Sequence, residues 1–180
     1  MKFYINKFKE IAAKENGTFY FSDSDIGIGG GVRSPHVILQ LRIPYKDYEI
    51  FINNKTGTSF VGTYSCTLPL ALKAPDFTIQ TRNHLSTLFS RNKKNRFKIT
   101  TEQEKLNEFL KKSSSLNALN TIAKDTIFEP YIYGKNSETD YQFKIEYHLQ
   151  FNNWTQVLEP LITFNKEIID ALENRSYTLH

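Results

Sequence analysis

The chain has 180 residues, a formal net charge of +4 at pH 7 and an aromatic content of 14%. This length suits one hydrophobic core and is short for two, so we expect a single domain over residues 1–180. The aromatic content excludes a disordered chain, because so many large apolar side chains favour a packed interior. No apolar run is long enough for a membrane span, and lysines interrupt the first residues, so neither a span nor secretion is expected.

The cysteine and the histidines narrow the chemistry further. Cys66 is the only cysteine, so it cannot form an internal disulfide, which is typical of a reducing compartment and predicts a cytoplasmic protein. The four histidines show no spacing of the H-x-x-x-H or H-E-x-x-H type. We therefore expect neither a metal site nor a cofactor.

The first half of the chain has the pattern of a short helix followed by antiparallel strands. Apolar residues at helical spacing predict an N-terminal helix that ends at Asn16-Gly17. A strand at 18–21 is predicted to lead into a loop over 22–31. Alternating apolar and polar residues then predict a meander, with strands at 37–43, 48–52 and 59–64 and a turn at 53–57.

The second half combines strands with helices. It predicts a strand at 77–81, a helical insertion around 102–124, and a hairpin from strands at 127–133 and 141–151. A long amphipathic helix follows from Trp154, with a kink or restart near Glu159 because Pro160 lacks a backbone donor. The predicted class is α+β: an antiparallel meander-type sheet covered by the C-terminal helix, with the short N-terminal helix and the insertion beside it.

Glycines are concentrated in the segment 27–31, just after Asp23 and Asp25. A dinucleotide site needs such glycines between a strand and a helix, and a Walker loop needs a following lysine; this segment runs into a strand and has no lysine. A calcium loop fails as well, because Ile28 stands where a glycine is required. Backbone freedom is the favoured interpretation. The alternative is an anion-binding nest formed by Gly29, Gly30, Gly31 and Arg33.

The same region also supplies the candidates for catalysis. Asp23, Asp25 and His36 are the acidic and imidazole side chains nearest to the glycines, and a histidine beside carboxylates can serve as an acid or base. They define one alternative function, an enzyme acting on a phosphorylated or nucleic-acid substrate at the loop 27–31. This alternative requires the three side chains and Arg33 to converge in one pocket.

Charge is distributed unevenly along the chain. Residues 82–112 sum to +6, whereas residues 126–174 sum to −5. We call residues 91–98 the basic segment, because they contain five cations, Arg91, Lys93, Lys94, Arg96 and Lys98. The segment is predicted to be a loop between two elements, and charged loops of this kind are commonly just solvated. Its cations also suit nucleic acid, an anionic membrane surface or an acidic protein partner.

These observations favour a non-catalytic cytoplasmic binding protein, comparable to a bacterial immunity or adaptor protein. Its basic segment would hold an acidic protein partner. Nucleic-acid binding without catalysis is a second alternative; it is less favoured because nearly every aromatic residue falls on the buried phase of a predicted element, which leaves few rings for base stacking. The oligomeric state does not follow from these patterns.

Overall fold

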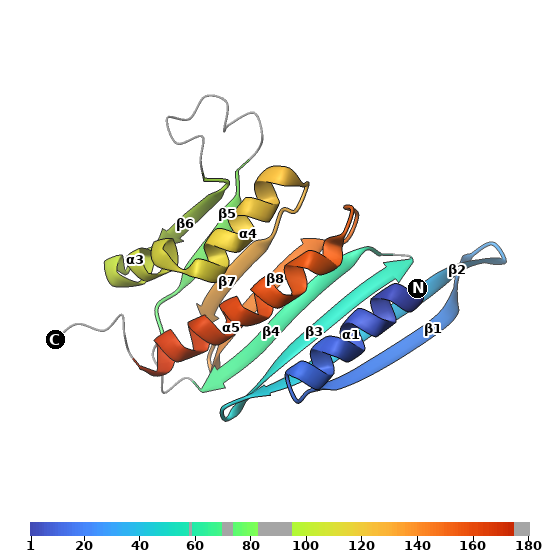
Figure 1. The fold of residues 1–180 in the computed structure, drawn as a ribbon, viewed down its shortest axis with the longest axis horizontal. Helices are drawn as coiled ribbons and strands as arrows, with labels where there is room; N and C mark the ends of the chain where they lie inside the picture. The colour runs from blue at the N-terminus through green and yellow to red at the C-terminus, as the bar shows by residue number, and fades with distance from the viewer. Residues whose placement is uncertain (58, 70–73, 83–94, 175–180) are drawn as a thin grey trace.

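The computed structural model describes residues 1–57, 59–69, 74–82 and 95–174 (Figure 1). It has the predicted α+β class. The elements in chain order are α1 (Lys2–Lys14), β1 (Thr18–Gly29), β2 (Val32–Tyr45), β3 (Tyr48–Gly57), β4 (Val61–Pro69), β5 (Phe77–Thr81), β6 (Phe97–Thr101), α3 (Glu104–Lys112), α4 (Ser114–Asp125), β7 (Tyr131–Asn136), β8 (Asp140–His148), the 3-10 helix η2 (Trp154–Val157) and α5 (Leu158–Glu173).

The strands form one eight-stranded sheet in the order β1-β2-β3-β4-β8-β7-β5-β6. Every neighbouring pair is antiparallel. The first four strands follow chain order and form the expected meander. The later strands do not, because β8 pairs with β4 and β5 lies between β7 and β6. Residues far apart in the chain are therefore neighbours in the second half of the sheet.

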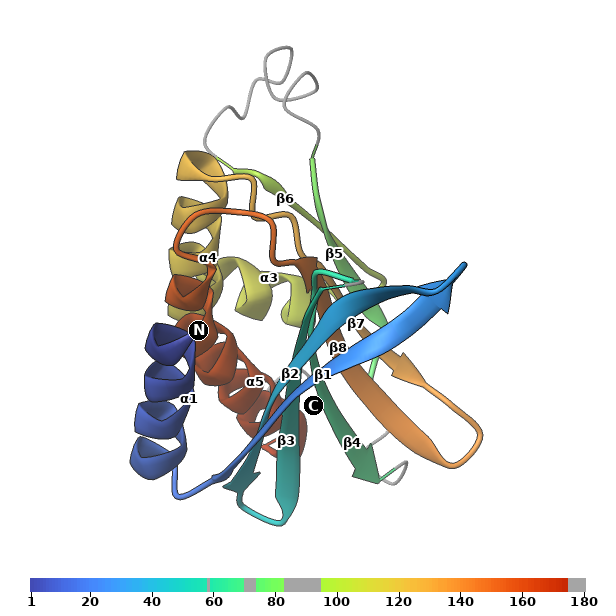
Figure 2. The same cartoon turned by 90° about the vertical axis from the view of Figure 1, so that its right-hand side faces the viewer.

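The helices lie on one face of the sheet, as the side view in Figure 2 shows. Helix α1 packs on β1 and β2, while α4 packs beside α5. We call the opposite side, which no helix of the described residues covers, the uncovered face. Successive side chains along each strand point alternately to the helix-covered face and to the uncovered face.

Helix α5 supplies much of the core. Its buried side chains include Leu161, Phe164 and Ile168, and the Phe164 ring lies 6.0 Å from that of Phe143 on β8. The predicted restart near Glu159 is confirmed, since η2 ends at Val157 and α5 begins at Leu158. Pro160 thus occupies the first turn of α5, where its missing N–H leaves no helical hydrogen bond unmade.

Three local expectations are wrong. Residues 22–29 continue β1 instead of forming a loop, because they pair with the extended β2. Residues 53–57 belong to β3, where pairing with β2 outweighs the turn propensity of asparagine and glycine. Residues 97–101 form β6, which pairs with β5 and takes the end of the basic segment into the sheet.

Candidate functional site

The uncovered face carries an excess of positive charge. Its charged side chains alternate with buried residues along the strands: the cations are Arg42, Lys55, Lys98, Lys135 and Lys144, and the acids are Glu49, Asp140 and Glu146. Two cations are paired on this face, since Arg42 lies 3.9 Å from Glu49 and Lys144 lies 2.5 Å from Glu146. The Glu146 hydrogen bond is the main reason that the pKa of Lys144 is raised.

Aromatic side chains also reach this face, contrary to the expectation that nearly all are buried. Tyr20 is 57% exposed and Tyr131 is 39% exposed. The ring of Tyr131 lies 5.5 Å from that of Tyr133, two residues further along β7 on the same side. The guanidinium of Arg42 lies 5.7 Å from the centre of the Phe51 ring. The uncovered face therefore combines cations with exposed rings.

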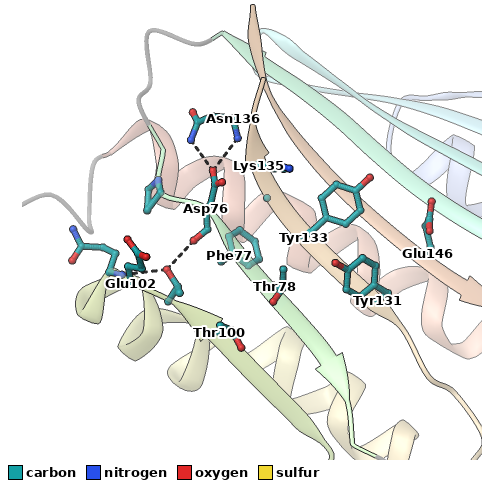
Figure 3. Close-up of a pocket in the computed structure, with 14 residues that line it drawn as sticks. Asp76, Phe77, Thr78, Thr100, Glu102, Tyr131, Tyr133, Lys135, Asn136 and Glu146 are labelled. Carbon is teal, nitrogen blue, oxygen red and sulfur yellow. Dashed lines mark hydrogen bonds between the residues drawn. The ribbon is translucent and has the colours of Figure 1, made fainter. Parts of the chain in front are cut away.

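A hollow of about 1160 Å³ lies at the β6-β5-β7 end of the sheet (Figure 3). Thr78, Thr100, Tyr131 and Tyr133 line its floor on the uncovered face. The strand register explains their meeting, because Thr78 of β5 pairs with Thr100 of β6 on one side and with Tyr133 of β7 on the other. Cross-strand partners on one face are close neighbours.

Hydrogen bonds fix one rim of the hollow. Asp76 Oδ1 accepts from the backbone N–H of Asn136 at 2.9 Å and from its Nδ2 at 2.8 Å. The Thr101 hydroxyl donates to the carbonyl of Asp76 at 2.9 Å. These contacts join the ends of β5, β6 and β7, so the rim is held by three strands rather than by one loop.

The glycine cluster forms the turn of the β1–β2 hairpin. Gly29, Gly30 and Gly31 have φ angles of 98°, 58° and 76°, which side chains other than glycine rarely adopt. The positive φ angles of the turn explain why glycine occupies these three positions, and this explanation requires no bound ligand. The anion-binding nest proposed for these glycines and Arg33 stays a prediction.

The candidate catalytic residues do not share one side of this hairpin. Asp23 is opposite Val37 and Asp25 is opposite Pro35, whereas His36 is opposite Ser24. Alternation puts His36 on one side and the two aspartates on the other. Arg33 is opposite Gly27, which assigns it to the aspartate side. The convergence that the enzyme alternative requires is absent among these four residues.

The basic segment is only partly described. Arg91, Lys93 and Lys94 lie outside the described residues. Arg96 is 4% exposed, its guanidinium lies 3.2 Å from Glu129, and its backbone N–H donates to Asn120 at 2.8 Å. Arg96 therefore stabilises the packing of this region, and of the two described cations only Lys98 lies on the exposed surface.

Three further features of the described part of the chain concern metal ligands, membrane spans and the thiol. This part contains no group of three or more His, Cys, Asp and Glu side chains that could hold a metal ion. None of its helices is both long enough and apolar enough to cross a membrane. Burial raises the pKa of the Cys66 thiol to about 12, which keeps it protonated at neutral pH.

Sequence reasoning did not identify the hollow. The signal that could have found it is the Tyr131-x-Tyr133 spacing within a predicted strand, which sends both rings to one face. The partners on β5 and β6 had no comparable signal, because the strand order that brings them beside β7 is not sequential.

Comparison with known proteins adds no family to these observations. No family model, no curated protein and no solved structure matches this chain.

Proposed function

We propose that this chain is a non-catalytic binding protein, of immunity or adaptor type, that holds an acidic protein partner on the uncovered face of its sheet. The observation that carries the proposal is the charge of that face, with five cations against three acids on its strands. One of these five cations, Lys98 on β6, belongs to the basic segment. Complementary charge steers association and selects the partner.

Two further features support this proposal. The helices already cover the opposite face, so the uncovered face is the broad sheet surface that remains for a partner. Asp23 and Asp25 lie on the opposite side of the hairpin from His36, which favours binding over catalysis. A cytoplasmic location belongs to the proposal as well, because Cys66 is a buried free thiol.

The test compares two charge reversals of equal size. Lys55→Glu, Lys98→Glu and Lys135→Glu are combined on the uncovered face; the matched control combines Lys9→Glu, Lys111→Glu and Lys124→Glu, which lie exposed on the helical layer. Binding of a labelled peptide of alternating glutamate and glycine is measured by fluorescence anisotropy. The first variant is expected to lose binding and the control to stay within about twofold of the wild type. Equal losses in both variants would show that net charge alone attracts the peptide.

Nucleic-acid binding is the second candidate, because Tyr20, Tyr131 and Tyr133 offer rings for base stacking beside the cations. Oligo-dT with the same net charge as the acidic peptide distinguishes nucleic-acid binding from binding of an acidic protein. Tighter binding of oligo-dT than of the acidic peptide, with a steep loss as salt rises, would favour nucleic acid over a protein partner.

A further inference from the structure

We propose that the hollow at the β6-β5-β7 end of the sheet is a binding site for an uncharged oligosaccharide. The site is centred on the Tyr131 and Tyr133 rings and on the hydroxyls of Thr78 and Thr100 (Figure 3). This assignment goes beyond the acidic partner and does not depend on it, since a different chemistry carries it.

Charge separates the hollow from the rest of the uncovered face. Among the described residues that line it, Asp76, Glu102 and Glu146 are acidic and Lys135 is the cation. A phosphate or an acidic peptide entering here would meet the carboxylates of Asp76 and Glu102, which repel it, whereas Glu146 is paired with Lys144. The hollow is thus less suited to an acidic partner or a nucleic acid than the rest of the uncovered face is.

The carboxylates do not make the hollow a site for a cation either. Asp76 is occupied by two hydrogen bonds from Asn136, and Glu146 lies 2.5 Å from Lys144. Glu102 stands on the β6 side of the hollow and Lys135 on the β7 side (Figure 3), so their opposite charges act on any ligand between them. The ligand expected to bind most tightly in the hollow is therefore polar but uncharged.

The lining matches the two kinds of surface that a sugar presents. Each sugar ring has an apolar face of C–H groups and an edge of hydroxyls. The paired tyrosine rings, 5.5 Å apart and tilted by 43° to one another, offer apolar ring surface with a phenolic hydroxyl at the end of each ring. Thr78 and Thr100 add hydroxyls that can both donate and accept, which is the pairing that sugar hydroxyls require.

Size and rigidity agree with this class of ligand. The volume of about 1160 Å³ exceeds the range of about 300–1,000 Å³ typical of small-molecule pockets, so it accommodates several linked rings rather than one. The floor is made of paired strands, and the rim is fixed by the hydrogen bonds of Asp76. Little ordering of the protein is needed when the ligand binds, which favours affinity.

The experiment titrates the full chain with four neutral probes: maltohexaose, cellohexaose, xylohexaose and chitohexaose. Binding is measured by isothermal titration calorimetry and by saturation-transfer NMR on the sugar protons. The main variant combines Tyr131→Ala and Tyr133→Ala, and the matched control is Tyr20→Ala, an exposed tyrosine of the same face outside the hollow. Thr100→Val is a milder variant that keeps a β-branched residue on the exposed side of β6.

At least one probe is expected to bind, with about tenfold or greater weakening in the double tyrosine variant and no change in Tyr20→Ala. Thr100→Val is expected to weaken binding about fivefold, which tests the site even if the double variant unfolds. Binding should persist between about 50 mM and about 500 mM salt, unlike that of the acidic peptide. Failure of all four probes to bind, equal weakening by Tyr20→Ala, or displacement of the sugar by oligo-dT would overturn the assignment.

Discussion

The carboxylate of Glu167 on α5 accepts a hydrogen bond from the hydroxyl of Ser113 at 2.6 Å. The same serine oxygen accepts the backbone N–H of Leu116 at 3.0 Å and so caps α4. Ser114 and Ser115 donate to the two oxygens of Glu167 as well, at 3.2 and 2.7 Å. One acidic side chain therefore fixes the start of α4 against the long C-terminal helix.

Replacing this carboxylate should destabilise the fold. Glu167→Ala leaves the buried Ser113 and Ser115 without the acceptor they share, so we expect a loss of about 2 kcal/mol in the free energy of unfolding. Urea denaturation followed by circular dichroism measures it. Glu108→Ala is the control, because its contact with Lys112 is exposed and should contribute less than about 0.5 kcal/mol. Equal effects of the two changes would contradict the capping role.

A second prediction concerns acid and the attachment of α1. Lys14 and Lys7 lie 2.6 and 2.8 Å from Glu159 on α5, and their hydrogen bonds, that of Lys14 first, lower the pKa of Glu159 below its usual value of 4.5. Because the pKa is lowered in the folded chain, this contact stabilises the fold fully above pH 4.5, and the stabilisation is lost as the pH falls through the lowered pKa.

The measurement compares urea midpoints at about pH 7 and about pH 3. Glu159→Gln should lose less stability between these two conditions than the wild type does, since the contact is already weakened at neutral pH. Glu49→Gln on the uncovered face is the control, and it should retain the wild-type dependence because its pair with Arg42 is exposed. An unchanged acid dependence in Glu159→Gln would refute the prediction.

A third prediction contrasts two glycines with positive φ. Gly57 has a φ of 110°, and a Cβ there would lie 1.7 Å from the carbonyl oxygen of Pro35. We expect Gly57→Ala to cost about 3 kcal/mol or more, because both the backbone angle and a neighbouring strand oppose it. Gly30 has a φ of 58°, and a Cβ added there would have nothing within 4 Å. Gly30→Ala should therefore lower the free energy of unfolding by only about 1 kcal/mol. Comparable losses at the two positions, measured by urea denaturation, would show that the approach of Pro35 is unimportant.

A fourth prediction concerns the thiol of Cys66. The residue is buried on β4, and burial raises the pKa of its thiol to about 12. We expect no reaction with Ellman's reagent at about pH 8 while the chain is folded, because the thiolate is scarce and shielded from the reagent. The chain unfolded in guanidinium is the control and should react at once. Rapid reaction of the folded chain would place the thiol at the surface.

Much of the fold follows from local patterns. The alternation around Leu39 and Leu41, the helical spacing around Ile11 and the long apolar stripe of α5 each predicted an element that the structure contains. The errors lie where pairing across the sheet overrides local preference. Ser22 to Gly29 have the composition of a loop, yet they extend β1 because β2 provides hydrogen-bond partners along almost their whole length.

The candidate site residues were likewise predicted correctly only in part. The sequence identified the charge of the basic segment correctly but treated Arg96 as part of a loop surface, whereas packing buries its side chain beside Glu129. It grouped Asp23 and Asp25 with His36 because they are close in the chain. Successive residues of a strand point to opposite sides of the sheet, and the pairing of β1 with β2 puts His36 on the side opposite to the two aspartates.

The sequence by itself determined the class of the protein, the positions of most elements and the residues that build its core, because periodicity along a strand or helix records which side is apolar. It also determined that glycines were needed at 29–31, where the backbone turns with positive φ. Only the tertiary structure decided which face of the sheet stays uncovered and which side chains meet there. Thr100, Thr78 and Tyr133 come from three strands that pair out of chain order, so their meeting depends on the order of strands in the sheet and not on any local pattern.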